Sequence, residues 1–495
     1  MAARGGGAGG GVASFAQQRM WFLDQLDPGS GVYNVAAAWR LRGRLDVDAL
    51  EAALNALIER HEVLRTGFHA EDGVPTPVVH DHVDLPLTLV DVSTAAEPGT
   101  RAAAVLRDAA EQPLDLQAGP FVRTLLVTVA EREHLLAMTL HHISVDGWSL
   151  DVLLRELAEL YAAFREGRPS PLPDLPIQYS DYARWQRELL TGDVLARHVG
   201  YWERALDGAP LTLDLPADRA RPPVPSYRGG VVTFACGAEL GERLRELSLR
   251  LGVTVFMTTA AAFAALLHRL TGQDDLCLGY SVANRDRVET EGVVGVFVNT
   301  LVLRARTDPA QTFEQAVTAV RDRMLDADAH RDLPFEKLVE ELRPPRDPRR
   351  HPVFQVTFGY GTTYGSRPST PGPGQCGTAF PDLEVSPVEP EYQTAKFDLS
   401  LFLSDTGAGT GLAGDAEFSS DLFERETIER FARQYVAVLE AVVTDPRMLV
   451  TDLPVTEPAR PRPVAESPAP EEPAAGAGEA SGRVVARTPT EVVVA

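Results

Sequence analysis

The chain is 495 residues long, which is more than one ordinary hydrophobic core uses, so two lobes or domains are expected. Its hydrophobic content of 44% and charged content of 24% are typical of a soluble globular protein, and no stretch approaches the roughly 20 apolar residues that cross a bilayer. The net charge of -23 repels nucleic-acid phosphates, so neither a membrane nor a nucleic acid is expected as a partner.

The two ends of the chain and the cysteines indicate which parts are disordered, where the protein is located and whether it binds a metal. Residues 1–12 are rich in Gly and Ala and predict a flexible leader that lacks the apolar core of a signal peptide. Residues 457–495 are rich in Pro, Ala and Glu and predict a disordered linker. The three cysteines, Cys236, Cys277 and Cys376, are far apart and lack metal-ligand spacing. We therefore expect reduced thiols, a cytoplasmic location and no metal site.

The first half of the folded part, residues 13–175, alternates strand and helix patterns. Apolar runs predict strands at 33–41, 121–130 and 134–140, and helical periodicity predicts helices at 47–61 and 150–164. A proline-rich stretch at 169–176 follows and indicates the end of an N-terminal lobe.

The second half, residues 176–456, predicts a C-terminal lobe of the same kind. Helices are expected near 254–270, 313–325 and 423–443, and strands near 275–281, 296–303, 353–358 and 397–403. Residues 361–381 are rich in Gly, Pro and Thr and predict an irregular excursion. Because strands and helices alternate in both halves, the predicted class is α/β or α+β in two lobes.

The run HHISVDGWS at 141–149 is the most informative stretch of the chain. An apolar strand leads into two histidines, and a helix follows at once. Since neighbouring strand residues point to opposite faces, only one of His141 and His142 can line a cavity, where an imidazole could accept a proton near neutral pH. Gly147 allows a close backbone approach, and Asp146 could orient the turn by pairing with a cation.

This run resembles the HHxxxDG core of the condensation domains of nonribosomal peptide synthetases. Six other segments resemble motifs of that family in the expected order: residues 14–22, 60–68, 179–185, 294–300, 330–336 and 346–355. Arg349 and His351 stand where the last motif has Ser and Asn, and Val294 replaces an Ile. The resemblance covers roughly residues 13–455.

The resemblance implies two chloramphenicol-acetyltransferase-like lobes in a V-shaped pseudodimer, with the HHxxxDG motif at a tunnel between them. Donor and acceptor would arrive on phosphopantetheine arms of carrier domains, with an adenylation domain in cis or in trans, and the chain itself would bind no cofactor and be monomeric. His142 would be the tunnel-facing histidine that deprotonates or positions the acceptor amine, with Gly147 as the second catalytic position.

Other roles follow from the same resemblance. His141 would support the site, and Asp146 would form a buried ion pair, for which Arg65 is the candidate partner. Further residues are expected to line the tunnel or contact substrate: Asn299, Gly295, Trp148 and Gln355. For Asn299 a capped strand end is an equal alternative, and for Trp148 simple packing is the favoured interpretation.

Related subtypes and functions differ in a few positions. The intact His141 and His142 exclude the heterocyclising type, and the Trp148-Ser149 order favours peptide formation over epimerisation. The segment ANRDR at 283–287 favours a D-configured donor. The remaining alternatives are a catalytically silent carrier-docking module and a free-standing enzyme that acylates a soluble amine or alcohol. Residues 487–495 resemble the start of a carrier domain.

Overall fold

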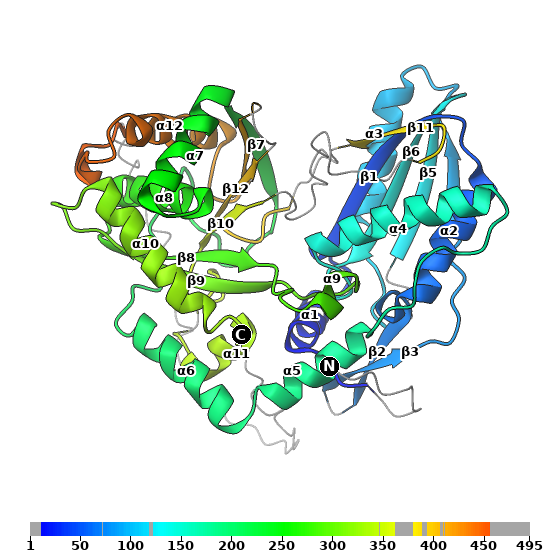
Figure 1. Ribbon diagram of the computed structural model, residues 1–495, viewed down its shortest axis with the longest axis horizontal. Coiled ribbons are helices and arrows are strands. Elements are labelled where there is room, and N and C mark those ends of the chain that lie inside the picture. The colour runs from blue at the N-terminus through cyan, green and yellow to red at the C-terminus, as the bar shows by residue number, and fades with distance from the viewer. Residues whose placement is uncertain are drawn as a thin grey trace, which may run out of the picture.

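The computed structural model describes residues 11–455 apart from 72, 118–121, 346, 362–379, 389–393, 406–408 and 410. Nearly all of the predicted leader, the predicted linker, the carrier-like segment at 487–495 and most of the excursion at 361–381 therefore lie outside the described residues. The described residues form two lobes of mixed helix and sheet that stand in a V (Figure 1). This arrangement confirms the predicted fold class.

The N-terminal lobe is built on a sheet that has five strands among the described residues, in the order β11-β1-β6-β5-β4. Its strands are β1 (Asn34–Gly43), β4 (Leu87–Asp91), β5 (Val122–Ala130), β6 (Glu133–His141) and β11 (Leu383–Val388). Helices α2 (Val47–Arg60) and α4 (Gly147–Arg165) pack on one face, and α3 (Pro98–Glu111) packs on the other. Both faces of β6 are thus covered, which explains its continuous apolar run.

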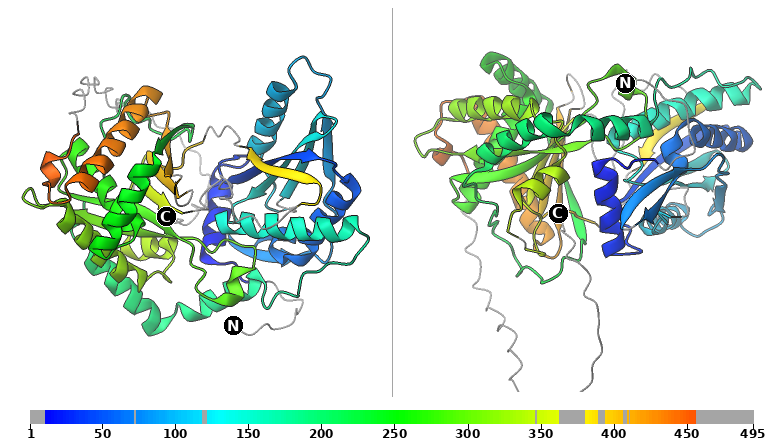
Figure 2. Two further views of the ribbon diagram at one scale, coloured as in Figure 1. Left: turned by 45° about the horizontal axis from the view of Figure 1, so that its top comes forward. Right: turned by 90° about the horizontal axis from the view of Figure 1, so that it is seen from below.

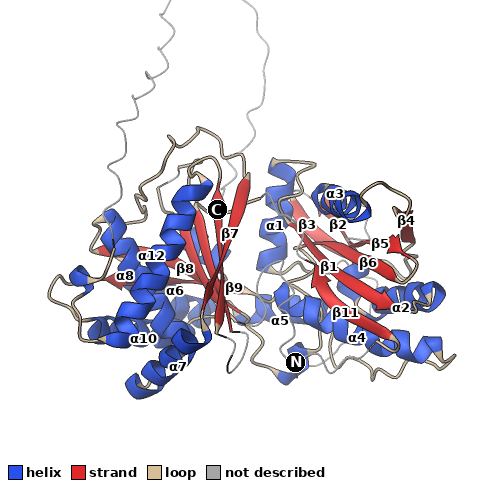
Figure 3. Cartoon of the chain, turned by 90° about the horizontal axis from the view of Figure 1, so that it is seen from above, coloured by secondary structure: helices blue, strands red, loops and turns tan. Residues whose placement is uncertain are grey.

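The sheet of the C-terminal lobe has six strands among the described residues, in the order β7-β13-β12-β10-β8-β9. They are β7 (Gly229–Cys236), β8 (Asp275–Val282), β9 (Asn299–Arg306), β10 (Val356–Tyr360), β12 (Leu399–Asp405) and β13 (Leu412–Ser419). The helices of this lobe are α7 (Ala238–Leu251), α8 (Val255–Thr271), α10 (Phe313–Asp328), α11 (Phe335–Leu342) and α12 (Arg425–Thr444). Seen from above, helices flank the sheet of each lobe (Figure 3).

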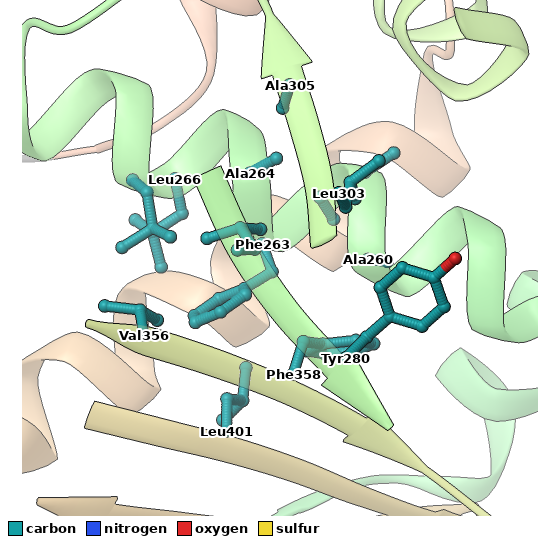
Figure 4. Packing of buried hydrophobic residues seen from close by; sticks show 14 of the residues in the cluster. Ala260, Phe263, Ala264, Leu266, Tyr280, Leu303, Ala305, Val356, Phe358 and Leu401 are labelled. Atoms are coloured by element: carbon teal, nitrogen blue, oxygen red, sulfur yellow. The ribbon is translucent and has the colours of Figure 1, made fainter. Parts of the chain in front are cut away.

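The C-terminal core lies where α8 crosses this sheet. Phe263 of α8 lies 5.4 Å, centroid to centroid, from Phe358 of β10, with Val356 and Leu401 beside them (Figure 4). Eleven of the 17 residues of α8 are buried. A helix that is enclosed by the core in this way is apolar around most of its circumference. Of the described helices, none is by itself long and apolar enough to cross a membrane, although α7 and α8, bent by 101°, pass that test as a pair.

Two segments from after residue 176 join the N-terminal lobe, so this part of the chain is not confined to one lobe. Strand β11 leaves the C-terminal lobe and pairs antiparallel with β1, with Val385 opposite Leu41 (Figure 2). Residues 293–298, here called the crossing segment, bury Val293, Val294, Val296 and Phe297 in the N-terminal core. Residues on the C-terminal side of the predicted boundary at 175 and 176 thus contribute a strand to the N-terminal sheet and side chains to the N-terminal core.

The remaining elements join the lobes at the base of the V or extend one of the two lobes. Helices α5 (Tyr179–Leu189) and α6 (Gly192–Leu206) run from one lobe to the other beneath the sheets (Figure 1). Smaller elements complete the described fold: α1 (Phe15–Leu26), η1 (Glu62–Arg65), β2 (Thr66–Glu71), β3 (Val74–Val79), α9 (Val288–Glu291) and η2 (Val450–Asp452).

Candidate active site

The HHxxxDG run lies between the end of β6 and the start of α4. Strand β6 ends at His141, which pairs with Asn34 of β1, and α4 begins at Gly147. The backbone N–H of His142 donates to the carbonyl oxygen of Tyr33 at 2.8 Å, which continues the strand pairing by one residue. The two histidines are thus held at the point where the sheet stops and the chain turns into the helix.

The side chain of His142 is half-buried, and its protonation can be deduced from one contact. Its Nδ1 lies 2.7 Å from the carbonyl oxygen of Val145. A carbonyl oxygen only accepts, so Nδ1 carries the hydrogen and the Nε2 lone pair is left to accept a proton. Burial, assisted by the charge of Lys396, lowers the pKa of His142 to about 4. The imidazole is therefore uncharged at neutral pH, as a base must be.

His141 lies on the packed side of the strand. It is 2% exposed, its Nδ1 accepts a hydrogen bond from the backbone N–H of Ile143 at 3.1 Å, and its ring lies 6.3 Å from that of Tyr33. Burial lowers the pKa of His141 to about 3. The pair therefore divides as strand geometry predicts: one histidine belongs to the core, and the other reaches a more open side.

Asp146 anchors the turn with both carboxylate oxygens. One oxygen accepts from the backbone N–H and the hydroxyl of Ser149, at 2.9 and 2.7 Å, and so caps the N-terminus of α4. The other accepts from the backbone N–H groups of Phe297 and Val298 in the crossing segment, at 2.9 and 3.3 Å. The carboxylate therefore fastens the N-terminal lobe to the segment that crosses into it.

The cation that pairs with Asp146 is Arg285, so the prediction of Arg65 is wrong. Nη2 of Arg285 lies 3.0 Å from the carboxylate, and both side chains are almost completely buried. Arg65 instead donates to the backbone carbonyl oxygen of His80, within the N-terminal lobe. The pair joins positions 139 apart in the sequence, which local spacing does not reveal.

Arg285 is itself held from several directions. Its Nη1 donates to the carbonyl oxygens of Thr290 and Val293, at 2.6 and 2.7 Å. Its guanidinium carbon lies 4.0 Å from the ring centroid of Phe297, within cation–π range. The residue belongs to the ANRDR segment at 283–287, and it contributes to the anchoring of the HHxxxDG turn.

Gly147, Gly295 and Trp148 lie around this anchor. Gly147 is the first residue of α4 and is half-buried. Gly295 is buried in the crossing segment, where an added Cβ would lie only 2.0 Å from Cδ2 of Tyr179. Trp148 is 40% exposed, and its Nε1 donates to the carbonyl oxygen of Glu291 at 3.0 Å. Gly295 thus serves close packing, and Trp148 joins α4 to α9 at the surface, which agrees with the favoured packing interpretation.

Asn299 and Gln355 are fully engaged inside the C-terminal lobe, which contradicts the tunnel-lining role expected for Gln355 and favours the strand-end interpretation of Asn299. The Asn299 amide donates to two backbone carbonyl oxygens at 2.7 and 2.8 Å and accepts from the backbone N–H groups of Thr300 and Phe335. Gln355 is 1% exposed and binds backbone groups of Leu211, Leu213 and His351. Both amides therefore hold loops in place.

A lysine that the sequence patterns did not single out faces the histidines from the other lobe. Lys396 lies three residues before the start of β12, and its Nζ lies 4.8 Å from the ring centroid of Tyr33. Its charge contributes to lowering the pKa of both His141 and His142. No sequence signal pointed to it, because a single lysine before a strand is common on protein surfaces.

The described residues do not include three or more His, Cys, Asp or Glu side chains grouped as a metal site. Cys236 and Cys277 are free and buried, and burial raises their pKa values to about 11 and 12, so both thiols stay protonated. Cys376 lies outside the described residues.

Comparisons with known proteins agree with the motifs. The family model for the condensation domain matches residues 11–462. The chain is 42% identical over 446 residues to one of the linear gramicidin synthase proteins of Brevibacillus parabrevis, covering 89% of this chain and 8% of that protein. It is 42% identical over 445 residues to phosphinothricin tripeptide synthetase PhsC of Streptomyces viridochromogenes, covering 89% and 40%. The chain thus spans less than half of the length of either relative.

A solved structure extends the agreement to the fold. The X-domain from teicoplanin biosynthesis matches with a TM-score of 0.82 and 32% identity, over 92% of this chain and 99% of that domain. Its partner in a second solved structure is named OxyB. Taken with the family match over nearly all described residues, this shows that the chain belongs to the condensation domain family of nonribosomal peptide synthetases and has its chloramphenicol-acetyltransferase-like, two-lobed fold.

Proposed function

We propose that this chain forms an amide bond between a donor acyl thioester and the amine of an acceptor, each carried on the phosphopantetheine arm of a carrier domain. The observation that carries the proposal is the state of His142: uncharged, oriented by Val145, and with its Nε2 accepting no hydrogen bond from the described residues. An imidazole in that state can accept the proton that the amine loses as it attacks.

The reaction balances without a covalent enzyme intermediate. The amine nitrogen attacks the thioester carbonyl carbon and forms the N–C bond, and the C–S bond then breaks. The nitrogen loses one proton to Nε2 of His142, which passes it to the departing sulfur, so the products are an amide and a free thiol. Holding two tethered substrates together supplies a large part of the rate, because it replaces a bimolecular encounter.

A second candidate is a docking module that binds carriers or another protein without catalysis. The specific observation in its favour is the match to the teicoplanin X-domain, which is crystallised with the partner OxyB. The uncharged, open His142 weighs against it, since a module without catalysis has no need of such a base. A D-configured donor is the finer proposal within the first function, supported by the ANRDR pattern around Arg285.

The test is an assay with two loaded carriers in which amide formation is followed by mass spectrometry. The native chain should form the amide, and His142→Ala should form it at least about 100-fold more slowly, as expected for loss of a general base. The matched control is His82→Ala, because His82 is an exposed histidine whose side chain is 69% accessible. D- and L-donors are compared in parallel, and a faster L-donor would overturn the stereochemical proposal.

Failure of the main proposal has a distinct signature. If the native chain binds both carriers but forms no amide with either donor, the docking function is correct. If His142→Ala and the native chain form amide at equal rates, His142 is not the base and the proposed chemistry is wrong.

A further inference from the structure

We propose that Lys396 is a further catalytic residue of this site, whose ammonium group binds the thioester carbonyl oxygen while that oxygen carries the negative charge of the tetrahedral intermediate. The proposal rests on the amide-forming function given above. In this proposal Lys396 of the C-terminal lobe stabilises the oxyanion, and His142 of the N-terminal lobe transfers the proton.

The geometry places the ammonium against the ring of Tyr33, the residue whose backbone also holds His142. Nζ of Lys396 lies 4.8 Å from the centroid of the Tyr33 ring, and the backbone oxygen of Tyr33 holds the backbone N–H of His142 at 2.8 Å. One tyrosine thus contacts the lysine with its ring and the histidine with its carbonyl. Both groups are therefore fixed to a single residue of the N-terminal lobe although they come from different lobes.

The backbone around Lys396 is pinned on both sides. The N–H of Ala395 donates to the carbonyl oxygen of Tyr227 at 2.8 Å, and the N–H of Asp398 donates to that of Gln355 at 3.0 Å. The carboxylate of Asp398 is also paired with Arg221. A lysine on an anchored segment loses less freedom when it binds a ligand than one on a free loop, so this position is prepared for binding.

The N–H donors of the Lys396 ammonium group are available for a ligand. The side chain of Lys396 is half-buried, and within the described part of the chain it makes neither an ion pair nor a hydrogen bond, only the contact with the Tyr33 ring. The carboxylate of Glu417 attracts the ammonium through space but forms no direct ion pair with it, so the ammonium hydrogens remain available to a ligand. A carbonyl oxygen that becomes an oxyanion is a partner of the right sign at the right stage of the reaction.

Several charged groups act on this lysine from the elements around it. Burial lowers the pKa of Lys396 to about 8, Arg19 of α1 adds to the effect, and Glu417 of β13 opposes it. Arg19 is itself paired with Glu336 at 3.0 Å, and the two histidines are uncharged at neutral pH. Lys396 is therefore charged at neutral pH and loses that charge as the pH rises through about 8.

In the proposed step the amine nitrogen attacks the carbonyl carbon, and the electron pair of the C=O bond moves to oxygen, where the ammonium of Lys396 donates a hydrogen bond to it. The pair returns as the C–S bond breaks and the thiolate leaves with the proton that His142 took from the amine. Lys396 keeps its own protons throughout, so no further reactant is needed.

The test compares Lys396→Met and Lys396→Arg with the native chain in the two-carrier assay, under single turnover with saturating carriers. Lys396→Met removes the charge at similar volume and should slow amide formation by about 100-fold or more, the usual effect of losing one oxyanion donor. Lys396→Arg keeps a charge and should recover at least about tenfold of that loss, because Arg remains a cation and a donor. Carrier binding should be unchanged in both variants.

The pH profile separates this role from a structural one. Above about pH 8 the native rate should fall relative to that of Lys396→Arg by up to tenfold per pH unit, because only the lysine loses its proton there. The acceptor amine is the same in all arms and cancels in this ratio. Since the comparison uses only the native chain and the Arg variant, it remains valid if Lys396→Met does not fold.

Three outcomes overturn the inference in different ways. A folded Lys396→Met with a rate within threefold of native shows that the charge is unnecessary, and a constant ratio of native to Arg-variant rates above pH 8 shows the same. A native chain that forms no amide overturns the proposed function first, and the inference falls with it. These results are distinguishable because only the last one affects the native chain.

Discussion

At the scale of single residues, the base and the aspartate that follows it are held by different kinds of contact. His142 is oriented by two backbone carbonyl oxygens, those of Tyr33 and Val145, which persist when side chains change. Asp146 is held by two side chains, the guanidinium of Arg285 and the hydroxyl of Ser149, in addition to backbone N–H groups. Orientation of the base and anchoring of the turn are therefore separable by substitution.

Replacing Arg285 with Met should destabilise the fold far more than replacing Arg65 with Met. The first change leaves the buried Asp146 carboxylate without its counter-charge, which costs about 3–5 kcal/mol. The second removes a half-buried arginine that donates to one backbone carbonyl oxygen, at a cost of about 1 kcal/mol. Thermal or denaturant unfolding measures both, and equal losses would show that Arg65 matters to the turn after all.

The role of Asp146 could be predicted from the sequence, but the residue that pairs with it could not. An Asp after a strand and before a helix is a recognisable N-cap, and the motif indicated a buried pair. Arg285 comes from a loop of the other lobe, and it reaches Asp146 because α4 packs against the crossing segment. Lys396 was missed for the same reason, because only the folded chain brings it near Tyr33.

At the scale of elements, the crossing segment is the feature that local patterns described least well. A strand was expected at 296–303, but β9 begins at Asn299, and the residues before it run into the N-terminal core. The apolar run is real, yet its first part is buried by helices of another lobe and not by strand pairing. Strand β11 was not predicted, because Pro387 and the charged Glu384 weaken its strand pattern.

Placing Ala at Gly295 should destabilise the domain, whereas Ala at Gly292 should be tolerated. The Cβ at 295 would collide with Tyr179, which cannot retreat because its hydroxyl bonds to Ser14 and to the carbonyl oxygen of Val296. Such overpacking costs about 1–3 kcal/mol. At 292 the nearest atom of another residue is 3.8 Å away, an ordinary contact. Unfolding midpoints of the two variants give the comparison, and matching midpoints would contradict this packing.

The longer elements were predicted well because their periodicity is unambiguous. The helix expected at 47–61 is α2, and the strands expected at 121–130 and 134–140 are β5 and β6. The insertion of β11 and of the crossing segment into the N-terminal lobe could not be predicted from such patterns, since it depends on which surfaces the folded lobes leave uncovered.

At the scale of the whole molecule, three histidines with lowered pKa values make the stability of the fold depend on pH. Burial lowers the pKa values of His141, His142 and His351 to about 3, 4 and 3. The unfolded chain binds these protons near pH 6.5, whereas the folded one does not until far lower pH. The stability that they contribute is thus complete above about pH 6.5 and is lost as the pH falls toward about 4.

The melting temperature should therefore fall between pH 7 and pH 5, and His351→Asn should reduce that fall. Each such histidine weakens folding by up to about 1.4 kcal/mol per pH unit in that window, so removing one removes its share of the slope. Asn is the residue that the family motif has at this position, which makes the change a mild one. If the melting temperature falls equally with pH in the native chain and in the variant, His351 binds no proton on unfolding and the prediction is wrong.

Because of strand β11, the N-terminal sheet is built from both halves of the chain, and this affects how hybrid synthetases can be assembled. A chimera spliced near residue 176 would place β1 of one parent beside β11 of the other, where Leu41 must face Val385 and Trp39 must face Pro387. A parent whose β11 differs in length or in its inward residues would leave β1 as an uncovered edge prone to aggregation. Compatibility of β1 and β11 is thus a criterion for choosing donor sequences, alongside the junction itself.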